Sequence, residues 1–311
     1  LSKNVYTIKN NIINNKYIKI KQKVDYYFRI LFKYFKKLLS KYPVLEYKLK
    51  KGRERLFILQ LHRIANEFRK ITLVEIGSSD LNESIILTKL LGEEKINSIV
   101  YEASKETYIR LKEIQQQNRL NNIKIIHKSI VPDNNSYYLK ESKEKNLNKL
   151  IRNNIDNSKE IKYEDILKFD NIEVIYKEQQ HKIIKMDIEG LEENIINSNY
   201  KLIAQLKNIS FCIELHQQSY KEPERLKKSF QHLIENKFQI KFVEFSMFCN
   251  QSMIKEYLTS KNIISKNNNR CLIKNPRKEI IDHLVYCDYR IINKPPFYSA
   301  KNIRSVTFQK Y

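Results

Sequence analysis

Tryptophan is absent from this 311-residue chain, and glycine, proline and methionine are scarce, with 4 Gly, 6 Pro and 3 Met. So little glycine and proline excludes collagen-like proteins and flexible or Pro-rich linkers, and makes the position of each glycine informative. No apolar run approaches the roughly 18 residues that a membrane-spanning helix needs. The 41 % of hydrophobic and 11 % of aromatic residues are too many for a disordered chain and predict a soluble globular protein.

Cysteine is also sparse, and its spacing excludes the usual frameworks. The 4 cysteines, Cys212, Cys249, Cys271 and Cys287, form no CxxC pair and have no nearby histidine repeat. This pattern predicts neither a disulfide framework nor a structural metal site, so the metal expected is none. Sparse thiols and the lack of an opening signal segment indicate an intracellular protein, of the cytoplasm or an organelle matrix.

The net charge of +23 is carried by the two ends of the chain. Residues 1–70 hold 19 basic and 4 acidic residues, residues 71–246 hold 27 of each sign, and residues 247–311 hold 12 basic and 4 acidic residues. We therefore predict a basic helical extension over 1–70, a core over 71–246 and a basic C-terminal extension over 247–311. Basic flanks are typical of contact with RNA or an anionic surface, although AT-rich coding also enriches lysine.

The first flank contains a basic amphipathic pattern. Apolar residues recur at helical spacing from Val24 to Leu39, with lysine and arginine on the remaining positions. Such a helix either packs on the core with a solvated lysine face or docks on a membrane surface or nucleic acid. A second helical pattern runs from Phe57 to Phe68.

The neutral core alternates between strand and helix patterns. This alternation predicts an α/β fold with a doubly wound, mostly parallel sheet. Residues 133–180 interrupt it and are expected to form a loop or short helices. A last β-like stretch, Ser305 to Phe308, is expected to complete the sheet, closing its edge. The predicted core strands are 72–76, 98–101, 123–127, 182–186, 209–215 and 238–245, and the predicted core helices are 106–117, 191–196 and 224–235, with a further helical pattern through Ile85 to Leu91.

The first strand-to-helix turn is the expected ligand site, because such folds bind ligands beyond the carboxyl ends of their strands. Gly77 lies in that turn, where a missing Cβ allows close approach, and Ser78 adds a hydroxyl. Glu102 ends the second predicted strand, near the spacing at which an acid accepts hydrogen bonds from a ribose diol. Together these residues predict a nucleoside-containing cofactor.

Three segments resemble the FkbM-type S-adenosylmethionine-dependent methyltransferases. They are Val74 to Ser79, Val100 to Ala103 and, most specifically, Ile184 to Glu192, which matches the signature K-x-D-x-E-G-x-E. A later strand that ends in Glu214-Leu215-His216 is similar to the E-x-H segment of that family. The resemblance covers about residues 71–246 and implies a Rossmann-like methyltransferase fold with S-adenosylmethionine as cofactor.

The resemblance also implies a set of site residues. The cofactor-binding residues would be Glu75, Gly77, Ser78, Ser79, Glu102, Ser129 and Asp187, and the catalytic residues would be Asp187, Glu189, Glu214 and His216. Asp187 would orient the cofactor or the acceptor, and one of the other three would take the acceptor proton. Histidine has the most suitable unperturbed pKa for that step, although a strand-end histidine is as often structural.

Two positions depart from the family pattern. Leu81 stands where the first turn usually has its second glycine, and Ala103 replaces the usual proline after the acid. A side chain at position 81 is expected to narrow the methionine end of the pocket and to weaken cofactor binding.

Two functional hypotheses follow. The first is S-adenosylmethionine-dependent O-methylation of a small molecule or glycan. The second is a catalytically degenerate methyltransferase fold that serves as a structural, RNA-contacting subunit of a ribonucleoprotein such as a ribosome, with the basic flanks binding phosphates. The lack of a G-x-G-x-x-G motif disfavours a dinucleotide-dependent enzyme.

Overall fold

The computed structural model describes residues 53–78, 80–133, 135, 137–140, 149–151, 158–161, 165–246, 263–267, 270–276, 278–285 and 303–311. The chain divides into two compact units, Leu1–Leu49 and Lys50–Tyr311, and all described residues belong to the second. The helix predicted between Val24 and Leu39 lies outside the described residues. The candidate residue Ser79 lies outside them as well.

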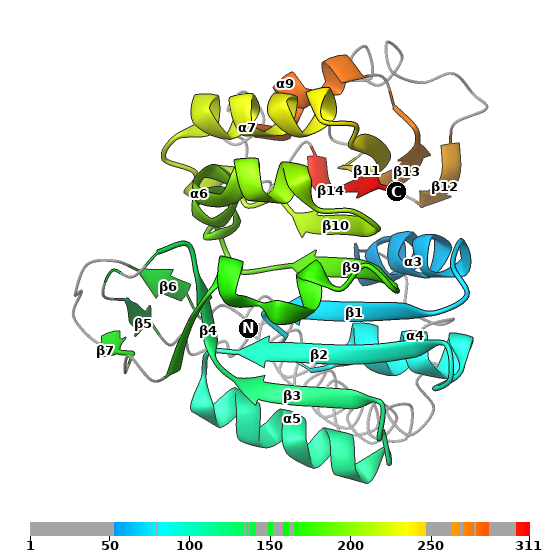
Figure 1. Cartoon of the computed structure of the whole chain (residues 1–311), viewed down its shortest axis with the longest axis vertical. Coiled ribbons are helices and arrows are strands. Elements are labelled where there is room, and N and C mark those ends of the chain that lie inside the picture. Colours follow the sequence, from blue (N-terminus) through cyan, green and yellow to red (C-terminus); the bar gives the residue numbers. More distant parts are fainter. Residues whose placement is uncertain are drawn as a thin grey trace, which may run out of the picture. The chain divides into compact units, whose positions relative to one another are not determined.

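A nine-stranded sheet forms the centre of this unit (Figure 1). Its order is β12 (Ile263–Asn267), β13 (Arg270–Lys274), β11 (Gln239–Ser246), β14 (Ile303–Lys310), β10 (Ile209–Glu214), β9 (His181–Met186), β1 (Ile71–Ile76), β2 (Ile96–Glu102) and β3 (Ile123–His127). The five strands from β10 to β3 are parallel, while β14 and β13 run against their neighbours. The predicted Rossmann-like, mostly parallel sheet is confirmed.

The order of strands reverses between β1 and β9. From β1 the chain proceeds outward to β2 and β3, whereas β9 is followed by β10 on the other side. In folds of this kind, ligands bind beyond the carboxyl ends of the strands at such a reversal, which here lies between β1 and β9. The turn that follows β1 therefore lies at the expected position.

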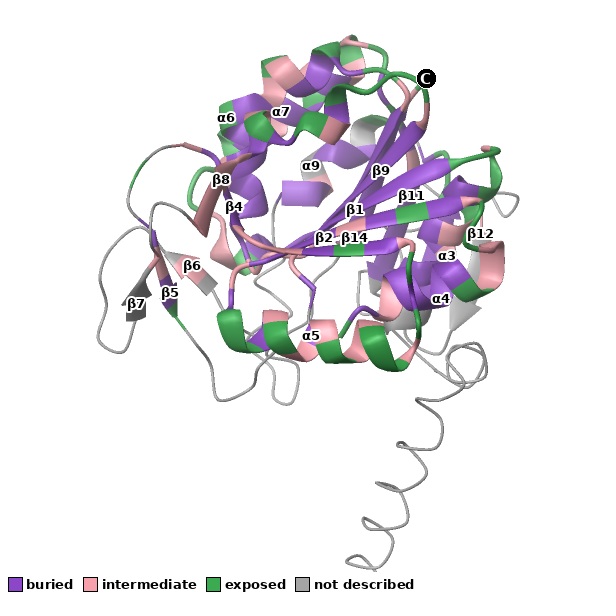
Figure 2. Ribbon diagram, turned by 60° about the horizontal axis from the view of Figure 1, so that its bottom comes forward, coloured by how far each residue is buried: buried purple, intermediate pink, exposed green. Residues whose placement is uncertain are grey.

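Helices cover both faces of the sheet, which agrees with a doubly wound fold (Figure 1). On one face, α3 (Arg53–Asn66) and α4 (Asn82–Leu91) pack against Ile71 and Leu73 of β1. On the other, α6 (Glu192–Gln205), α7 (Pro223–Glu235) and α9 (Ile281–Val285) belong to the same apolar cluster as Val74 and Ile76. Because both faces are covered, all residues of β1, β9 and β10 are buried (Figure 2).

The segment between β3 and β9 contains strands that the sequence pattern did not predict. β4 (Ser129–Val131) pairs with β8 (Ile166–Lys168), and β5 (Tyr138–Lys140) pairs with β6 (Lys149–Ile151) and β7 (Ser158–Glu160). Short 3₁₀ helices follow at Phe169–Asn171 and Glu173–Tyr176. The prediction of a loop or short helices was thus incomplete, because three-residue strands are too short to show an alternating pattern.

The predicted last strand is present, but it lies inside the sheet and not at its edge. β14 is inserted between β10 and β11 and is antiparallel to both. Gln60 of α3 donates a hydrogen bond to Ser305 Oγ (2.8 Å) and accepts one from Thr307 Oγ1 (3.0 Å). α3 lies before the charge-based boundary at residue 70 but packs on the sheet. β14 lies after the boundary at residue 246 but is one of the strands of the sheet.

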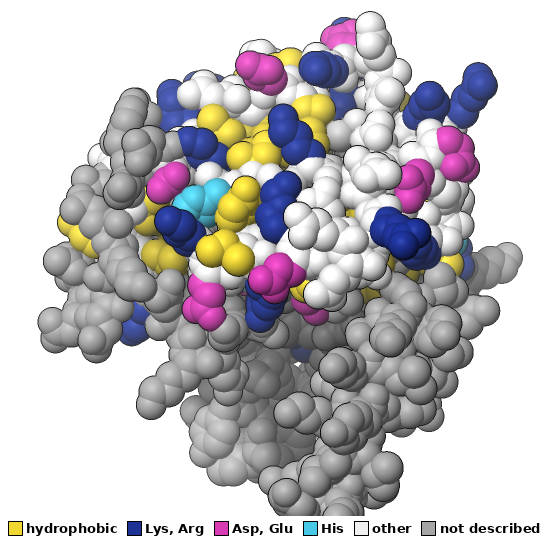
Figure 3. Space-filling model, turned by 90° about the horizontal axis from the view of Figure 1, so that it is seen from below, with side chains coloured by type: hydrophobic (Ala, Val, Ile, Leu, Met, Phe, Trp, Pro, Cys, Tyr) yellow, Lys and Arg dark blue, Asp and Glu magenta, His cyan; other side chains and the backbone are white. Residues whose placement is uncertain are grey.

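The side of the molecule formed by α5 (Lys105–Gln117) has a mixed surface (Figure 3). Lys and Arg side chains are interspersed with acidic and apolar ones in the described part of this face, and Ile109 is 49 % exposed. On this face the described residues form no continuous basic patch. Among the helices that the structure describes, none combines the length and apolarity needed to cross a bilayer.

Candidate functional site

The turn after β1 is packed directly against the turn after β9. Gly77 has φ 79°, and a Cβ on it would lie 2.5 Å from the backbone oxygen of Asp187 and 2.9 Å from Ile188 Cγ2. Only glycine allows both this left-handed backbone and this approach. The sequence predicts that Gly77 faces a ligand. In the structure Gly77 also allows the turn after β1 to contact the turn after β9.

Lys185 of β9 contacts both of these turns with its ammonium group. Its Nζ donates a hydrogen bond to Gly77 O (2.7 Å) and lies 3.8 Å from Asp187 Oδ2, and the side chain is buried. Burial lowers the pKa of Lys185, but four neighbouring carboxylates outweigh this effect and raise the pKa above its usual range; they are, in order of effect, Glu83, Asp187, Glu75 and Asp80. Lys185 is therefore a buried cation that positions the turn and the Asp187 carboxylate. Lys185 is the first residue of the K-x-D-x-E-G-x-E segment, but this positioning role was not predicted from the sequence.

Glu75 is the next-to-last residue of β1 and is buried. Its exposed fraction is 0 %, and its carboxylate accepts a hydrogen bond from Ser84 Oγ at the start of α4. Burial raises its pKa to about 7, against the attraction of Lys185. Glu75 thus holds the start of α4, and its role as a cofactor-binding residue stays a prediction.

Glu102 ends β2 beside the first turn, as predicted from its spacing. Its Oε1 accepts a hydrogen bond from Ser104 N (2.7 Å), and its Oε2 accepts a longer one from Ser78 N (3.4 Å). Burial raises the pKa of Glu102 to about 7, although both backbone bonds oppose the shift. The carboxyl thus lies next to the glycine turn, and its contact with Ser78 is long enough for a better donor to displace.

Leu81 does not fill the space above this turn, contrary to the expectation. Its backbone is left-handed (φ 59°, ψ 16°), and its N–H donates to Ser78 Oγ (3.3 Å). Its side chain is fully buried in an apolar cluster with Ile85, Val100 and Leu111, between α4, α5 and β2. Leucine therefore adopts a left-handed backbone conformation of the kind that glycine accepts readily, while its side chain contributes to the core.

Ser129 lies next to the end of β2. The preceding residue, Lys128, donates its N–H to Glu102 O (3.1 Å), so the chain passes close to the Glu102 backbone. Ser129 is 1 % exposed, and its Oγ has no hydrogen-bond partner among the described residues. Because a buried hydroxyl without a partner is unfavourable, this orphan atom is the kind of group that a bound ligand satisfies.

The four predicted catalytic residues come together at the ends of β9 and β10. Measured from His216 Nε2, the carboxylate oxygens lie at 3.4 Å (Glu189 Oε2), 3.7 Å (Asp187 Oδ1) and 4.0 Å (Glu214 Oε1). His216 is buried, whereas the Asp187 side chain is 31 % exposed. The cluster thus has an imidazole at its base and a carboxylate that solvent can reach.

Glu192, the first residue of α6, fixes the orientation of His216. Its Oε1 lies 3.0 Å from His216 Nδ1 and accepts hydrogen bonds from His216 N (3.0 Å) and Tyr220 Oη (3.1 Å). Its Oε2 accepts from Gly190 N (2.9 Å). An ionised carboxylate only accepts, so Nδ1 carries a proton and Nε2 faces the other carboxylates. Glu192 was not among the predicted site residues. Its position as the last acid of the K-x-D-x-E-G-x-E segment was the sequence feature that pointed to it.

The residues around the first turn fit an adenosine-containing cofactor in their chemistry. Gly77 provides a turn at the strand-order reversal, Glu102 provides a hydrogen-bond acceptor for ribose hydroxyls, and the Ser129 hydroxyl is an orphan polar atom beside them. Asp187 completes the set from the end of the neighbouring strand β9, where its N–H donates to Ile76 O (3.3 Å).

The structure also brings together residues that could ligate a metal, although the sequence predicted none. Asp187, Glu214 and His216 each offer one ligand atom, and these atoms all lie within 4.8 Å of one another. These residues come from two strand ends, so their sequence spacing matches no familiar metal motif.

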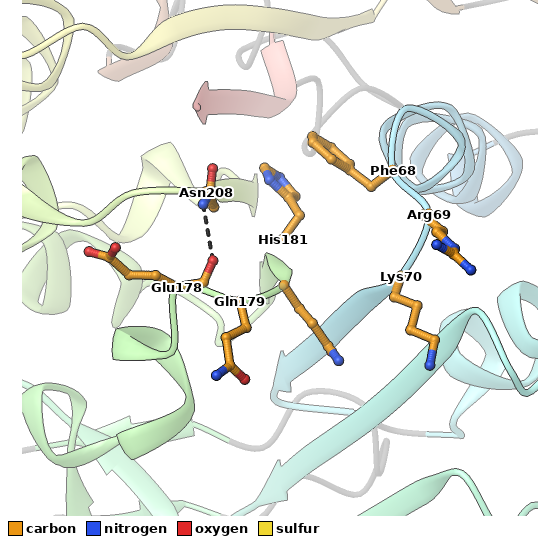
Figure 4. Close-up of a pocket in the computed structure, with 8 residues that line it drawn as sticks. Phe68, Arg69, Lys70, Glu178, Gln179, His181 and Asn208 are labelled. Atoms are coloured by element: carbon orange, nitrogen blue, oxygen red, sulfur yellow. Dashed lines mark hydrogen bonds between the residues drawn. The ribbon is translucent and has the colours of Figure 1, made fainter.

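A cavity of about 580 Å³ lies at the opposite end of the sheet (Figure 4). Its lining comes from the segments that lead into β1, β9 and β10: Phe68, Arg69, Lys70, Glu178, Gln179, Gln180, His181 and Asn208. Asn208 Nδ2 donates to Glu178 O (3.1 Å) across its rim. Because this cavity is at the amino ends of the strands, we place the candidate site elsewhere, at the carboxyl ends.

No protein-family model matches the chain, and no curated protein matches it. Similar solved structures include precorrin-6y C5,15-methyltransferase from Geobacter metallireducens (10 % identity, 81 % of this chain and 87 % of that chain, TM-score 0.34). Others are methyltransferase FkbM from Methylobacillus flagellatus (13 %, 64 % and 54 %, 0.36) and a SAM-dependent methyltransferase from Aquifex aeolicus (10 %, 75 % and 97 %, 0.33). TM-scores below 0.5 at such identities assign neither an activity nor a substrate to this chain.

Proposed function

We infer that the chain is an S-adenosylmethionine-dependent methyltransferase that methylates a hydroxyl group of a small molecule or glycan. The observation that carries this proposal is the convergence, at one strand-order reversal, of the Gly77 turn, the Glu102 carboxylate and the Asp187 cluster. Each of these features is at the carboxyl end of a parallel strand, where ligands of such folds bind.

On the cofactor side, the chain's own groups would bind the nucleoside. Glu102 would accept hydrogen bonds from the ribose hydroxyls in place of its long bond from Ser78 N, and Ser129 Oγ would contact the adenine. Asp187 would hold the ammonium of the methionine part, in a position that Lys185 fixes. When bound, S-adenosylmethionine supplies an electrophilic methyl group on a sulfonium.

On the acceptor side, the cluster of His216 and its carboxylates would orient a hydroxyl and take its proton. Methyl transfer to oxygen depends mainly on alignment, with proton removal as a second contribution. The His216 ring cannot rotate without breaking the contact of its Nδ1 with Glu192, so Nε2 would stay directed at the acceptor side. A carboxylate such as Glu189, 3.4 Å from that atom, can receive the proton next to it.

Calorimetric titration with S-adenosylmethionine and with its demethylated product tests the proposal. We expect micromolar binding by the full chain, weakened about 10-fold or more in Glu102→Ala, because two hydrogen bonds to a buried carboxylate are lost. Glu178→Ala, a largely exposed acid at the far end of the sheet, is the matched control and should bind as wild type. No heat with either ligand would overturn the proposal.

The second hypothesis, a structural RNA-contacting subunit, is distinguished by the salt dependence of RNA binding. One outcome is that the affinity for RNA rises steeply as the salt concentration falls while S-adenosylmethionine does not bind. In that case this alternative replaces the first. The deletion that tests the basic flank should end at residue 49 and not at residue 70, because α3 packs in the core through Leu56, Phe57 and Leu61.

A further inference from the structure

The cluster beneath the acceptor side has the composition of a metal site. We propose that Asp187, Glu214 and His216 bind a divalent transition-metal ion, of the Mn²⁺, Fe²⁺ or Zn²⁺ class. Their ligand atoms lie within 4.8 Å of one another and come from the ends of two adjacent strands, β9 and β10. Strand ends are held rigidly by the sheet, which is what a preformed ligand set requires.

The spacing of the ligand atoms agrees with a single central ion. His216 Nε2 lies 3.7 Å from Asp187 Oδ1 and 4.0 Å from Glu214 Oε1. Two ligands bonded at about 2.1 Å to one ion are separated by about 3.0 Å when adjacent and about 4.2 Å when opposite. The observed distances fall in this range, so small side-chain shifts would complete the coordination.

The type of ligand narrows the choice of ion. Imidazole nitrogen favours transition metals, whereas carboxylate oxygen suits both these and the harder ions. One nitrogen and two carboxylates from the protein leave coordination positions open, as in sites where a substrate binds the metal. A site for Ca²⁺ alone would be built from oxygen atoms.

Glu192 lies outside the three proposed ligands and contacts the far side of the His216 ring. A histidine that binds a metal usually donates its other ring N–H to a carboxylate, which fixes the tautomer and directs the ligating nitrogen. The contact of 3.0 Å between Glu192 Oε1 and His216 Nδ1 has this geometry, and Glu192 is 0 % exposed. The ring is thereby held with Nε2 toward Asp187 and Glu214.

The charges around the cluster favour a cation at its centre. Three carboxylates approach Nε2 of His216 within 4.0 Å. The nearest fixed cations contact the periphery: Lys185 Nζ is 3.8 Å from the second oxygen of Asp187, and Arg304 Nη2 is 3.6 Å from Glu214 Oε1. Asp187 can keep Lys185 on Oδ2 while its Oδ1 ligates an ion. At Glu214 the same Oε1 faces both Arg304 and His216, so one oxygen, with its two lone pairs, would have to serve Arg304 and the ion together.

The role of the ion in methyl transfer rests on the proposed function, whereas its binding does not. A hydroxyl oxygen of the acceptor that binds such an ion loses its proton more readily, because the metal lowers the hydroxyl pKa. The O–H bond then breaks and the proton passes to the carboxylate of Glu189, which is outside the ligand set and 16 % exposed. The ion would thus both align the acceptor oxygen with the methyl group and make its proton easier to remove.

Electron paramagnetic resonance of Mn²⁺ titrated into the metal-free full chain tests the proposal. Bound Mn²⁺ loses the sharp signal of the free ion, so a dissociation constant can be measured without any enzyme assay. We expect binding well below about 1 mM, weakened about 10- to 100-fold in His216→Gln and in Glu192→Gln. Glu193→Gln is the matched control, because the neighbouring Glu193 bonds Lys221 N and Glu222 N and not His216.

The outcomes separate the ion from the cofactor. An unchanged Mn²⁺ signal at about 1 mM protein and metal, or equal affinities in wild type and the His216 and Glu192 variants, overturns the metal site. Replacement of Mn²⁺ by Co²⁺ gives a second readout, since the visible spectrum of Co²⁺ changes when an imidazole ligand is lost. Titration of S-adenosylmethionine in the presence of a chelator then shows whether the proposed function stands or fails independently.

Discussion

Leu81 shows how one residue can depart from a motif and still keep its backbone shape. A non-glycine residue at φ 59° costs about 1 kcal/mol or more in strain, but the buried leucine side chain returns more than that by packing with Val100 and Leu111. The departure from the family pattern is therefore compensated locally, in the core and not in the pocket.

Replacement of Leu81 by glycine tests this explanation. We expect Leu81→Gly to lower the free energy of unfolding by about 2 to 4 kcal/mol, because the lost packing exceeds the relieved strain. Affinity for S-adenosylmethionine should stay as in wild type. If the side chain instead obstructed the pocket, the variant would bind the cofactor more tightly, which calorimetry combined with urea denaturation would reveal.

Glu102 is the residue whose ionisation should control cofactor binding. Burial raises its pKa to about 7, so below neutral pH the carboxyl is protonated and accepts hydrogen bonds less well. We expect the dissociation constant for S-adenosylmethionine to increase up to about 10-fold per pH unit as the pH falls below 7, and to be nearly constant above it. Calorimetric titrations between pH 6 and pH 8 measure this.

A variant without a titratable group at this position supplies the control. Glu102→Gln should bind weakly at every pH, with the dependence near pH 7 removed. An equally steep pH dependence in wild type and Glu102→Gln would show that another group is responsible. Glu75, whose pKa is also raised to about 7, is the group to replace next.

At the scale of elements, β9 carries two buried lysines with different tasks. Lys185 connects the strand end to the Gly77 turn, whereas Lys182, at the amino end, donates to Lys177 O (2.6 Å) and Lys207 O (3.0 Å). One strand therefore provides its own matched control for the role of a buried cation.

Substitution of each lysine by methionine separates site from stability. We expect Lys185→Met to reduce the free energy of unfolding by about 3 to 5 kcal/mol, since it leaves buried carboxylates without their cation, and to abolish cofactor binding. Lys182→Met should cost about 1 to 3 kcal/mol and leave the cofactor affinity unchanged. If both variants lose binding equally, Lys185 is not a specific positioning residue.

His181, at the start of β9, is a second element-scale feature that titrates. Its ring stacks on Phe68 with centroids 3.6 Å apart, and Nε2 lies 2.8 Å from Ser210 Oγ. Burial, with the nearby Lys182 charge, lowers the pKa of His181 to about 3. The fold therefore holds a neutral imidazole, which contributes stability above pH 6.5 that is lost as the pH falls toward 3.

Urea denaturation as a function of pH measures this contribution. Between pH 6.5 and pH 5 the unfolding free energy of wild type should fall relative to that of His181→Gln, by at most about 1.4 kcal/mol per pH unit. The difference between the two proteins isolates His181, because Glu75 and Glu102 titrate in both with the opposite sign. Parallel pH profiles would contradict the assignment.

The elements were predictable where burial imposes a long pattern. β1, β9 and β10 are buried on both faces, and each has an apolar centre followed by a polar turn, even though β9 also carries two buried lysines. The three-residue strands from β4 to β8 could not be predicted, because their pairing depends on contacts distant in sequence and not on local periodicity.

At the scale of the whole molecule, the sequence indicated the members of the site but not their relations. The sequence resemblance made Asp187 and His216 candidates, yet only the adjacency of β9 and β10 brings them within 3.7 Å. Burial of Glu75 beneath α4, and of Leu81 between helices, depends on which face each side chain takes when the sheet is assembled. No local pattern contains that information.

The two ends of the described unit meet through Gln60, which joins α3 to β14. Its side chain bonds both Ser305 and Thr307, and all three side chains are buried. β14 completes the interior of the sheet, so the first described helix and the last strand must dock together for the fold to close. The stability of the whole unit should therefore respond to this small polar contact.

We expect Gln60→Leu to lower the unfolding free energy by about 1 to 3 kcal/mol, because it leaves buried hydroxyl groups of Ser305 and Thr307 without their amide partner. Gln117→Leu, an exposed position near the end of α5, is the control and should change it little. Replacement on the Thr307 side should recover part of the loss, since an apolar group of similar shape needs no partner: the double variant Gln60→Leu, Thr307→Val should unfold at a higher urea concentration than Gln60→Leu alone. Ser305 is kept, because its Oγ donates to the buried Glu244 Oε2 (3.2 Å). A Gln60→Leu protein as stable as wild type would mean that the contact between the two ends contributes nothing to closure of the sheet.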